Sequence, residues 1–172
     1  MAHYPSTGDI HAFTGPPKPL AARITDWLES GRSGVLTPAV REQIIRFVAR
    51  APSEELSAQL VHGDFRSSNI LCTGHDVTAV LDFEEARFDH PVMELAQSAV
   101  MLGTRFRDWG PVPPDVHTWL REGYESERPL TRAEADWWNL LVLWFSFLLV
   151  PPGEDPTGWG PAARALLPEM TT

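Results

Sequence analysis

The 172-residue sequence lacks most features of secreted, membrane-spanning or nucleic-acid-binding proteins. Its single cysteine, Cys72, excludes an internal disulfide framework and indicates a reducing compartment. Lys and Arg total 14 against 23 Asp and Glu, so no basic cluster is available to neutralise nucleic-acid phosphates. The most apolar run, residues 137–150, is shorter than the roughly 20 residues that a membrane span needs. No secretory signal follows Met1. We therefore expect a cytoplasmic protein with no nucleic-acid or membrane partner.

Composition favours one folded domain. Hydrophobic residues make up 43% of the chain and charged residues 22%, a balance typical of globular proteins. We expect a single domain over residues 1–172, with an irregular lead-in at 1–19 and an irregular tail at 154–172. The net charge of −9 leaves two interpretations open. It suits cationic small molecules or basic partners, and it also serves solubility alone.

Apolar spacing predicts a mostly helical α+β fold. Helical periodicity and caps indicate helices that start near Leu20, Thr37, Pro91, Pro114 and Thr131, with a short one near Ala162–Leu167. Thr131 and Glu134 form a capping box. Between the second and third helices the period shortens, and three apolar segments predict strands: 59–61, 70–72 and 77–81. The last two flank a turn at 73–76, which predicts one small β-hairpin.

Aromatic residues and the cysteine are assigned mainly to packing. Trp137, Trp138 and Trp144 fall on the last long helix and are expected in the core. Cys72 lies in a predicted strand and is expected to be an inert core thiol. Trp109 and Trp159 lie in loops rich in glycine and proline, which makes them candidate ligand contacts.

Three polar residues lie around the predicted hairpin. Asp64 and Asn69 stand at the two ends of one loop, and Asp82 follows the second hairpin strand. Phosphoryl transfer requires a carboxylate that orients and deprotonates the acceptor hydroxyl, together with oxygen ligands that hold Mg²⁺ on the nucleotide phosphates. The hairpin would bring Asp82 back beside the loop. An Asp-x4-Asn pair alone has another interpretation, because both residue types are common in turns.

The full segment resembles the aminoglycoside phosphotransferase and choline kinase group, which is distantly similar to protein kinases. The resemblance is carried by His62-x-Asp64-x4-Asn69 and by the later apolar-apolar-Asp82-Phe83. It implies the large C-terminal lobe of a protein-kinase-like fold. One departure is Glu94, which stands where the family usually has aspartate before Leu-Ala.

The resemblance also implies roles for individual residues. Asp64 would be the catalytic base, and Asn69 and Asp82 would bind Mg²⁺ with ATP or GTP. His62 and Arg66 would support the loop. Arg66 has three further interpretations: a phosphate contact, an ion pair with Glu84, and a solvated loop arginine. No substrate-binding residue is assigned. The implied reaction is O-phosphorylation of a small hydroxyl-bearing acceptor, which for this family includes cationic antibiotics and so antibiotic resistance.

A kinase-like small lobe is not found in the sequence. There is no Gly-x-Gly-x-x-Gly, and Lys18, the single lysine, lies among prolines where a central strand is excluded. We expect the nucleotide-binding small lobe to be absent. The chain is then a fragment, a shortened homologue or a repurposed scaffold. Two functions follow: a phosphotransferase completed by a homodimer or partner that covers the exposed face, and a non-catalytic binding or scaffold protein.

Overall fold

The computed structural model describes residues 16–52, 56–105 and 109–167, and its architecture is α+β and mostly helical. The helices are α1 (Leu20–Glu29), α2 (Pro38–Val48), α3 (Pro91–Met101), α4 (Pro114–Glu127), α5 (Arg132–Leu148) and α6 (Trp159–Ala165), with short 3-10 turns at Gly31–Val35, Ser67–Asn69 and Phe83–Glu85. The strands are β1 (Gln59–Val61), β2 (Ile70–Thr73), β3 (Asp76–Val80) and β4 (Arg87–Asp89). Within these described ranges, no helix is both long enough and apolar enough to span a membrane.

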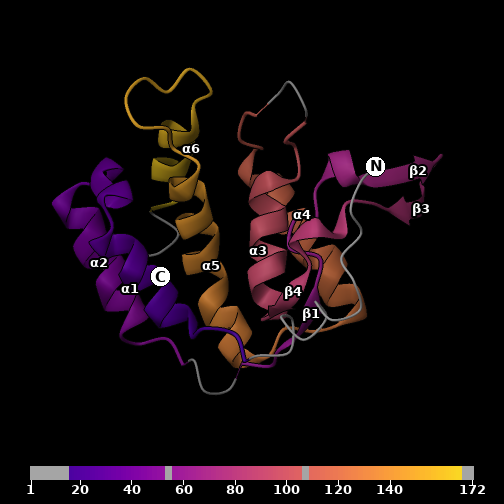
Figure 1. Cartoon of the computed structure of the whole chain (residues 1–172), viewed down its shortest axis with the longest axis horizontal. Helices are drawn as coiled ribbons and strands as arrows, with labels where there is room; N and C mark the ends of the chain where they lie inside the picture. The colour runs from indigo at the N-terminus through magenta and orange to yellow at the C-terminus, as the bar shows by residue number, and fades with distance from the viewer. Residues whose placement is uncertain (1–15, 53–55, 106–108, 168–172) are drawn as a thin grey trace.

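The core is built around α3 and α5, which lie side by side at the centre of Figure 1. Helix α5 is buried on nearly all sides, and Trp137 at its start has no exposed surface. The ring of Trp27 on α1 meets that of Trp144 edge-on at 6.5 Å, so the N-terminal helices pack against α5. Helix α4 packs against α3, and α6 packs against α5. The prediction that Trp137, Trp138 and Trp144 lie in the core is confirmed.

The helix boundaries follow the capping signals in the sequence. The Thr37 hydroxyl accepts a hydrogen bond from the backbone of Val40, and the Thr131–Glu134 capping box is complete. Prolines occupy the first turn of α3 and α4, where the missing N–H removes no helical bond. Helix α6 begins three residues before the predicted start, at Trp159.

The strands form two separate two-stranded antiparallel sheets rather than one hairpin alone. The β2–β3 hairpin is confirmed and projects from the helices at the right of Figure 1. The second sheet joins β1 to β4, with Gln59 opposite Asp89, and its β4 strand was not predicted. Arg87–Asp89 is three residues long with two charges, so it carries no apolar alternation. It is a strand because it pairs with a segment distant in the sequence.

Two expectations about individual side chains were wrong. Cys72 is exposed, because β2 lies in a hairpin whose strands are largely open to solvent. Trp159, proposed as a ligand contact, is 3% exposed and its indole N–H donates to the carbonyl of Trp109. Trp159 is therefore a packing residue, whereas Trp109 remains 42% exposed.

An ion pair fixes the start of α5 and predicts a large stability effect. The Glu134 side chain is 1% exposed and accepts hydrogen bonds from Arg128 at 2.8 Å and from the Thr131 backbone at 2.9 Å. Arg128→Met should lower the free energy of unfolding by about 3 kcal/mol, because it leaves a buried carboxylate without its cation. Urea denaturation measures this. The control Arg46→Met breaks an exposed i,i+4 pair and should cost less than about 0.5 kcal/mol; equal losses in both variants would contradict the prediction.

Candidate active site

The loop between β1 and β2 is held by its backbone. Gly63 has φ of +83°, a left-handed conformation that favours glycine. Its N–H donates to the Glu94 carboxylate at 2.8 Å, and its carbonyl accepts from the Gln97 amide at 2.8 Å. Both partners lie on α3, three residues apart and therefore on one face. The central helix thus fixes the peptide that precedes Asp64.

The carboxylate of Asp64 is the meeting point of the loop. Its Oδ2 accepts from the Asn69 amide at 2.9 Å and from the Arg66 Nε at 3.0 Å. The same Asn69 nitrogen also donates to the Asp64 carbonyl at 2.9 Å. Asn69 is buried, while Asp64 is partly accessible. The structure therefore brings Asp64, Arg66 and Asn69 into direct contact, and the alternative pairing of Arg66 with Glu84 is not the one observed.

Asp82 is placed beside this loop through the residue before it. The Leu81 N–H donates to the Asn69 carbonyl at 2.8 Å, and the Leu81 carbonyl lies 2.8 Å from Nε2 of His62. The other ring nitrogen of His62 accepts from the Asp64 backbone N–H at 3.2 Å, so Nε2 is the protonated nitrogen that donates to Leu81. His62 thus connects the two loops, and its ring lies 4.5 Å from that of Phe83.

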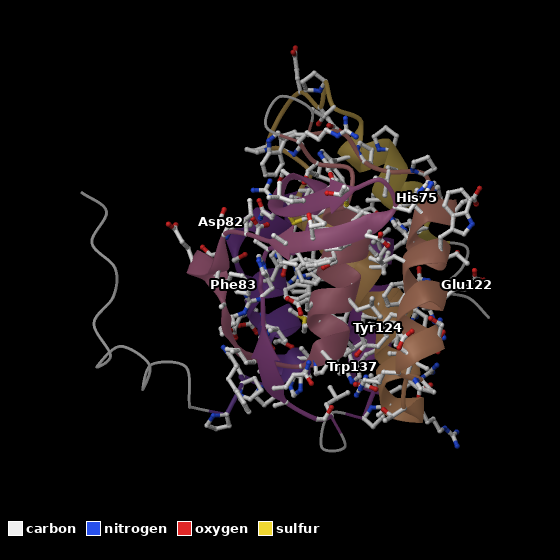
Figure 2. All side chains as sticks on the ribbon, turned by 90° about the vertical axis from the view of Figure 1, so that its right-hand side faces the viewer. His75, Asp82, Phe83, Glu122, Tyr124 and Trp137 are labelled. Atoms are coloured by element: carbon white, nitrogen blue, oxygen red, sulfur yellow. The ribbon has the colours of Figure 1, made fainter. Side chains whose placement is uncertain are left out.

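Asp82 itself adopts a left-handed conformation, with φ of +66°. Aspartate tolerates this region better than most residues, although it still implies local strain. Its side chain is exposed and makes no hydrogen bond or ion pair with the described part of the chain. Figure 2 shows Asp82 and Phe83 together at one edge of the molecule, where the β3 strand ends. An exposed carboxylate held by a strained backbone is available to a ligand.

The side chains present fit a hard cation such as Mg²⁺. Asp64 and Asp82 offer carboxylate oxygens and Asn69 offers an amide oxygen, and Mg²⁺ prefers oxygen ligands. Because the Asn69 nitrogen is committed to Asp64, the amide oxygen is the atom left for a metal, and its neighbour is the Ser68 hydroxyl at 3.4 Å. The amide oxygen is therefore the Asn69 atom that would hold a metal.

The segment after α3 contacts the same loop. The Ser67 N–H donates to the Leu102 carbonyl at 3.2 Å, and the guanidinium of Arg66 lies 5.3 Å from the centre of the Trp109 ring. Trp109 is in turn bonded through its carbonyl to Trp159 at the start of α6. Trp109 thus lies against Arg66, which is itself paired with Asp64, and of the two tryptophans proposed as ligand contacts it is the one that borders the site.

Sequence reasoning identified the polar loop residues but missed their supports. Glu94 was noted only as a departure from the family pattern, and Gln97 was not noted. Their spacing of three residues on a predicted helix was the available signal, but it does not reveal which loop that helix face meets.

The buried carboxylate of Asp89, at the end of β4, predicts that the protein loses stability in acid. Burial alone would raise the pKa of the Asp89 carboxyl, but hydrogen bonds and charge from Arg23, with bonds from the His90 backbone and Arg87, hold it below its ordinary 3.8. A lowered native pKa gives stability that is present above the unfolded-state value and is lost as pH falls through the native one. The free energy of unfolding should therefore decrease below about pH 4.

Urea denaturation from pH 7 to pH 3 checks this prediction. Asp89→Asn should be less stable at pH 7 and should show a shallower loss of stability on acidification. Glu42→Gln, which removes an exposed carboxylate paired with Arg46, is the matched control. A pH dependence unchanged by Asp89→Asn would show that another carboxyl is responsible.

The sequence was compared with models of known protein families. The chain matches the family model described as the phosphotransferase enzyme family over residues 7–133. The chain belongs to this family, and the resemblance to kinase-like phosphotransferases inferred from the sequence is confirmed. A search of curated proteins finds no match.

Proposed function

We propose that the chain carries the catalytic loop of an O-phosphotransferase that transfers phosphate from a Mg-nucleotide to a small hydroxyl-bearing acceptor. The observation that supports this most strongly is the bonded cluster of Asp64, Arg66 and Asn69. The Leu81 N–H donates to the Asn69 carbonyl, so the residue before Asp82 is bonded to the same loop, which supports a shared site. Family membership supports the same reaction class.

Each residue has a distinct task in this proposal. Asp64 accepts the proton of the acceptor hydroxyl as the new O–P bond forms. Asn69 and Asp82 hold Mg²⁺, which neutralises charge on the phosphates when the nucleotide is bound. Arg66 balances the charge of Asp64, with which it forms an ion pair, and is proposed to contact a phosphate. His62, Glu94 and Gln97 position the loops and do not touch the reacting atoms.

The acceptor is proposed to be a small hydroxyl-bearing amine. The chain carries a net charge of −9, which favours a cationic ligand. The exposed Asp82 is one carboxylate near the site that no arginine neutralises within the described residues. ATP and GTP remain equally suitable donors.

The nucleotide also requires a cation at its phosphates, and no lysine in the described part of the chain is available for this contact. The single lysine, Lys18, forms an ion pair with Asp26 on α1. Apolar side chains are exposed on the hairpin and just beyond it, namely Leu71, Val77, Leu81 and Phe83. A partner or second copy that covers this surface would bury apolar area and supply the missing phosphate contacts.

The exposed hairpin also favours a second candidate, a non-catalytic binding protein built on the same fold. Its support is that Lys18 is committed to Asp26 and lies apart from the catalytic loop in sequence. In that case the hairpin surface binds a partner and the polar loop has no turnover.

Phosphoryl transfer tests the proposal directly. The chain is incubated with Mg-ATP or Mg-GTP and a panel of amino alcohols and aminoglycosides, and phosphorylated products are measured by mass spectrometry. Product that requires both Mg²⁺ and the chain supports the enzyme. Absence of product across the panel, together with failure of Mg-nucleotide to stabilise the chain, favours the binding protein.

A further inference from the structure

A cavity of about 310 Å³ lies between α4 and α5, bordered by Leu166 after α6. None of its lining residues belongs to the loops that carry Asp64 and Asp82. Figure 2 shows Glu122, which lines this cavity, on the opposite side of the molecule from Asp82. The cavity is therefore separate from the candidate active site. Its volume is at the lower end for small-molecule sites.

A buried imidazole faces this cavity without a partner. His117 is 9% exposed, lines the cavity, and has no hydrogen bond or ion pair with any described residue. Burial lowers the pKa of His117, so the ring is neutral at pH 7 and offers one donor and one acceptor. The fully enclosed polar atoms without a partner among the described residues are the Ser67 hydroxyl and the Trp144 indole N–H. The His117 ring nitrogens are not among them, so they keep contact with solvent. A ligand in the cavity would hydrogen-bond to the imidazole in place of water.

The remaining walls define the charge of that ligand. Arg121 is committed: its Nε lies 2.9 Å from Glu125, and its guanidinium lies 5.7 Å from the centre of the Trp138 ring. Glu122 makes no ion pair with the described residues and keeps its charge uncompensated. With His117 neutral, two carboxylates against one guanidinium leave the cavity one negative charge in excess. This favours a cation over an anion.

The cavity also offers neutral hydrogen-bonding groups and an apolar side. Thr118 and Asn139 line it from α4 and α5, and neither makes a side-chain hydrogen bond to a described residue. Val142 and Leu166 provide the apolar contact. Hydroxyl groups on a ligand would match Thr118, Asn139 and His117, while an ammonium group would match Glu122.

We propose that this cavity is a second ligand site, which binds a small polyhydroxylated organic ammonium ion through Glu122 and His117. The proposal does not depend on catalysis at Asp64. It assigns a binding function to the face of α4 that carries Glu122, on the opposite side of the molecule from Asp82 (Figure 2).

Three six-carbon probes of similar shape and different charge test the site at pH 7: glucamine as the cation, sorbitol as the neutral compound and gluconate as the anion. Binding is followed by the tryptophan indole N–H resonances in ¹H–¹⁵N NMR spectra, with the Trp138 signal assigned by its loss in Trp138→Phe. Glucamine should shift the Trp138 resonance in a saturable manner. Sorbitol should bind about tenfold or more weakly, because it lacks the charge-assisted bond, and gluconate should not bind.

Matched variants connect the signal to the cavity. Glu122→Gln, at an exposed position, should weaken glucamine binding about tenfold without loss of folding. His117→Leu keeps the side-chain volume and should also weaken binding. Glu127→Gln, on the same helix but outside the cavity, should bind like the wild type. The proposal is overturned if Trp138 does not respond to glucamine, if the three probes bind alike, or if Glu122→Gln binds as tightly as Glu127→Gln.

Discussion

Asp64→Asn is expected to lower the rate of phosphoryl transfer by about 10²- to 10⁴-fold, the usual contribution of a positioned general base. Asparagine retains the size of the side chain and one oxygen acceptor for the bonds from Arg66 and Asn69. It cannot take the proton of the acceptor hydroxyl. The loss should therefore appear in kcat for whichever acceptor of the panel is phosphorylated, with little change in thermal stability.

The control for this substitution is Asp76→Asn, which makes the same chemical change in the β2–β3 hairpin that follows the Asp64 loop. Asp76 is exposed at the start of β3, away from the bonded cluster. It should leave the rate unchanged within about twofold. If Asp64→Asn retained full activity, Asp64 would not be the base. If both variants lost activity equally, the effect would come from the hairpin rather than from the carboxylate.

Gly63→Ala is expected to destabilise the protein by about 3 kcal/mol and to displace the loop that carries Asp64. A β-carbon at this position would lie 2.2 Å from the Glu85 carbonyl oxygen and 2.5 Å from the Arg87 guanidinium. The first of these atoms is backbone, so it cannot rotate away as a side chain would. A left-handed φ adds about 1–2 kcal/mol for a residue with a β-carbon. Nucleotide binding should be lost with the loop geometry.

Gly74→Ala separates the two causes of that loss. Gly74 has φ of +63°, but an added β-carbon there meets nothing within 4 Å. The control should therefore show only the backbone cost, about 1 kcal/mol. Urea denaturation of both variants measures the difference. If Gly63→Ala proved as stable as Gly74→Ala, the close approach of the Gly63 backbone to the Glu85 carbonyl would be contradicted.

Local signals in the sequence predicted the helices well. The Thr131–Glu134 capping box and the prolines in the first turn of α3 and α4 act within one turn, so no distant contact is needed to identify them. The β2–β3 hairpin was predicted for the same reason, since its turn joins neighbouring segments. Strand β4 was missed because its partner, β1, lies far away in sequence and its own three residues carry no pattern.

Whether a face of a short strand is buried or exposed is equally hard to predict from sequence. Cys72 was assigned to the core because its neighbours are apolar, but the hairpin extends away from the helices and both of its faces are largely open. An apolar run indicates that a segment can be buried. What covers that segment is decided by tertiary packing.

The candidate site could be predicted where its residues lie close together in the sequence. Asp64 and Asn69 are close in sequence, and the structure bonds them directly. Asp82 required the hairpin, which the sequence predicted. The contacts of Glu94 and Gln97 with Gly63 could not be predicted, because they depend on how α3 rotates against a loop about 30 residues earlier.

The central claim, that Asp64, Asn69 and Asp82 form a site for a metal-bound nucleotide, is tested most directly by calorimetric titration with Mg-ATP. Asp82→Asn is the decisive variant, because asparagine also tolerates the left-handed conformation and removes only the charge. The account predicts that the wild-type chain binds ATP only with Mg²⁺ and that Asp82→Asn abolishes this binding without loss of fold. ATP binding that persists in Asp82→Asn or without Mg²⁺, or wild-type protein that does not bind Mg-ATP, would contradict it.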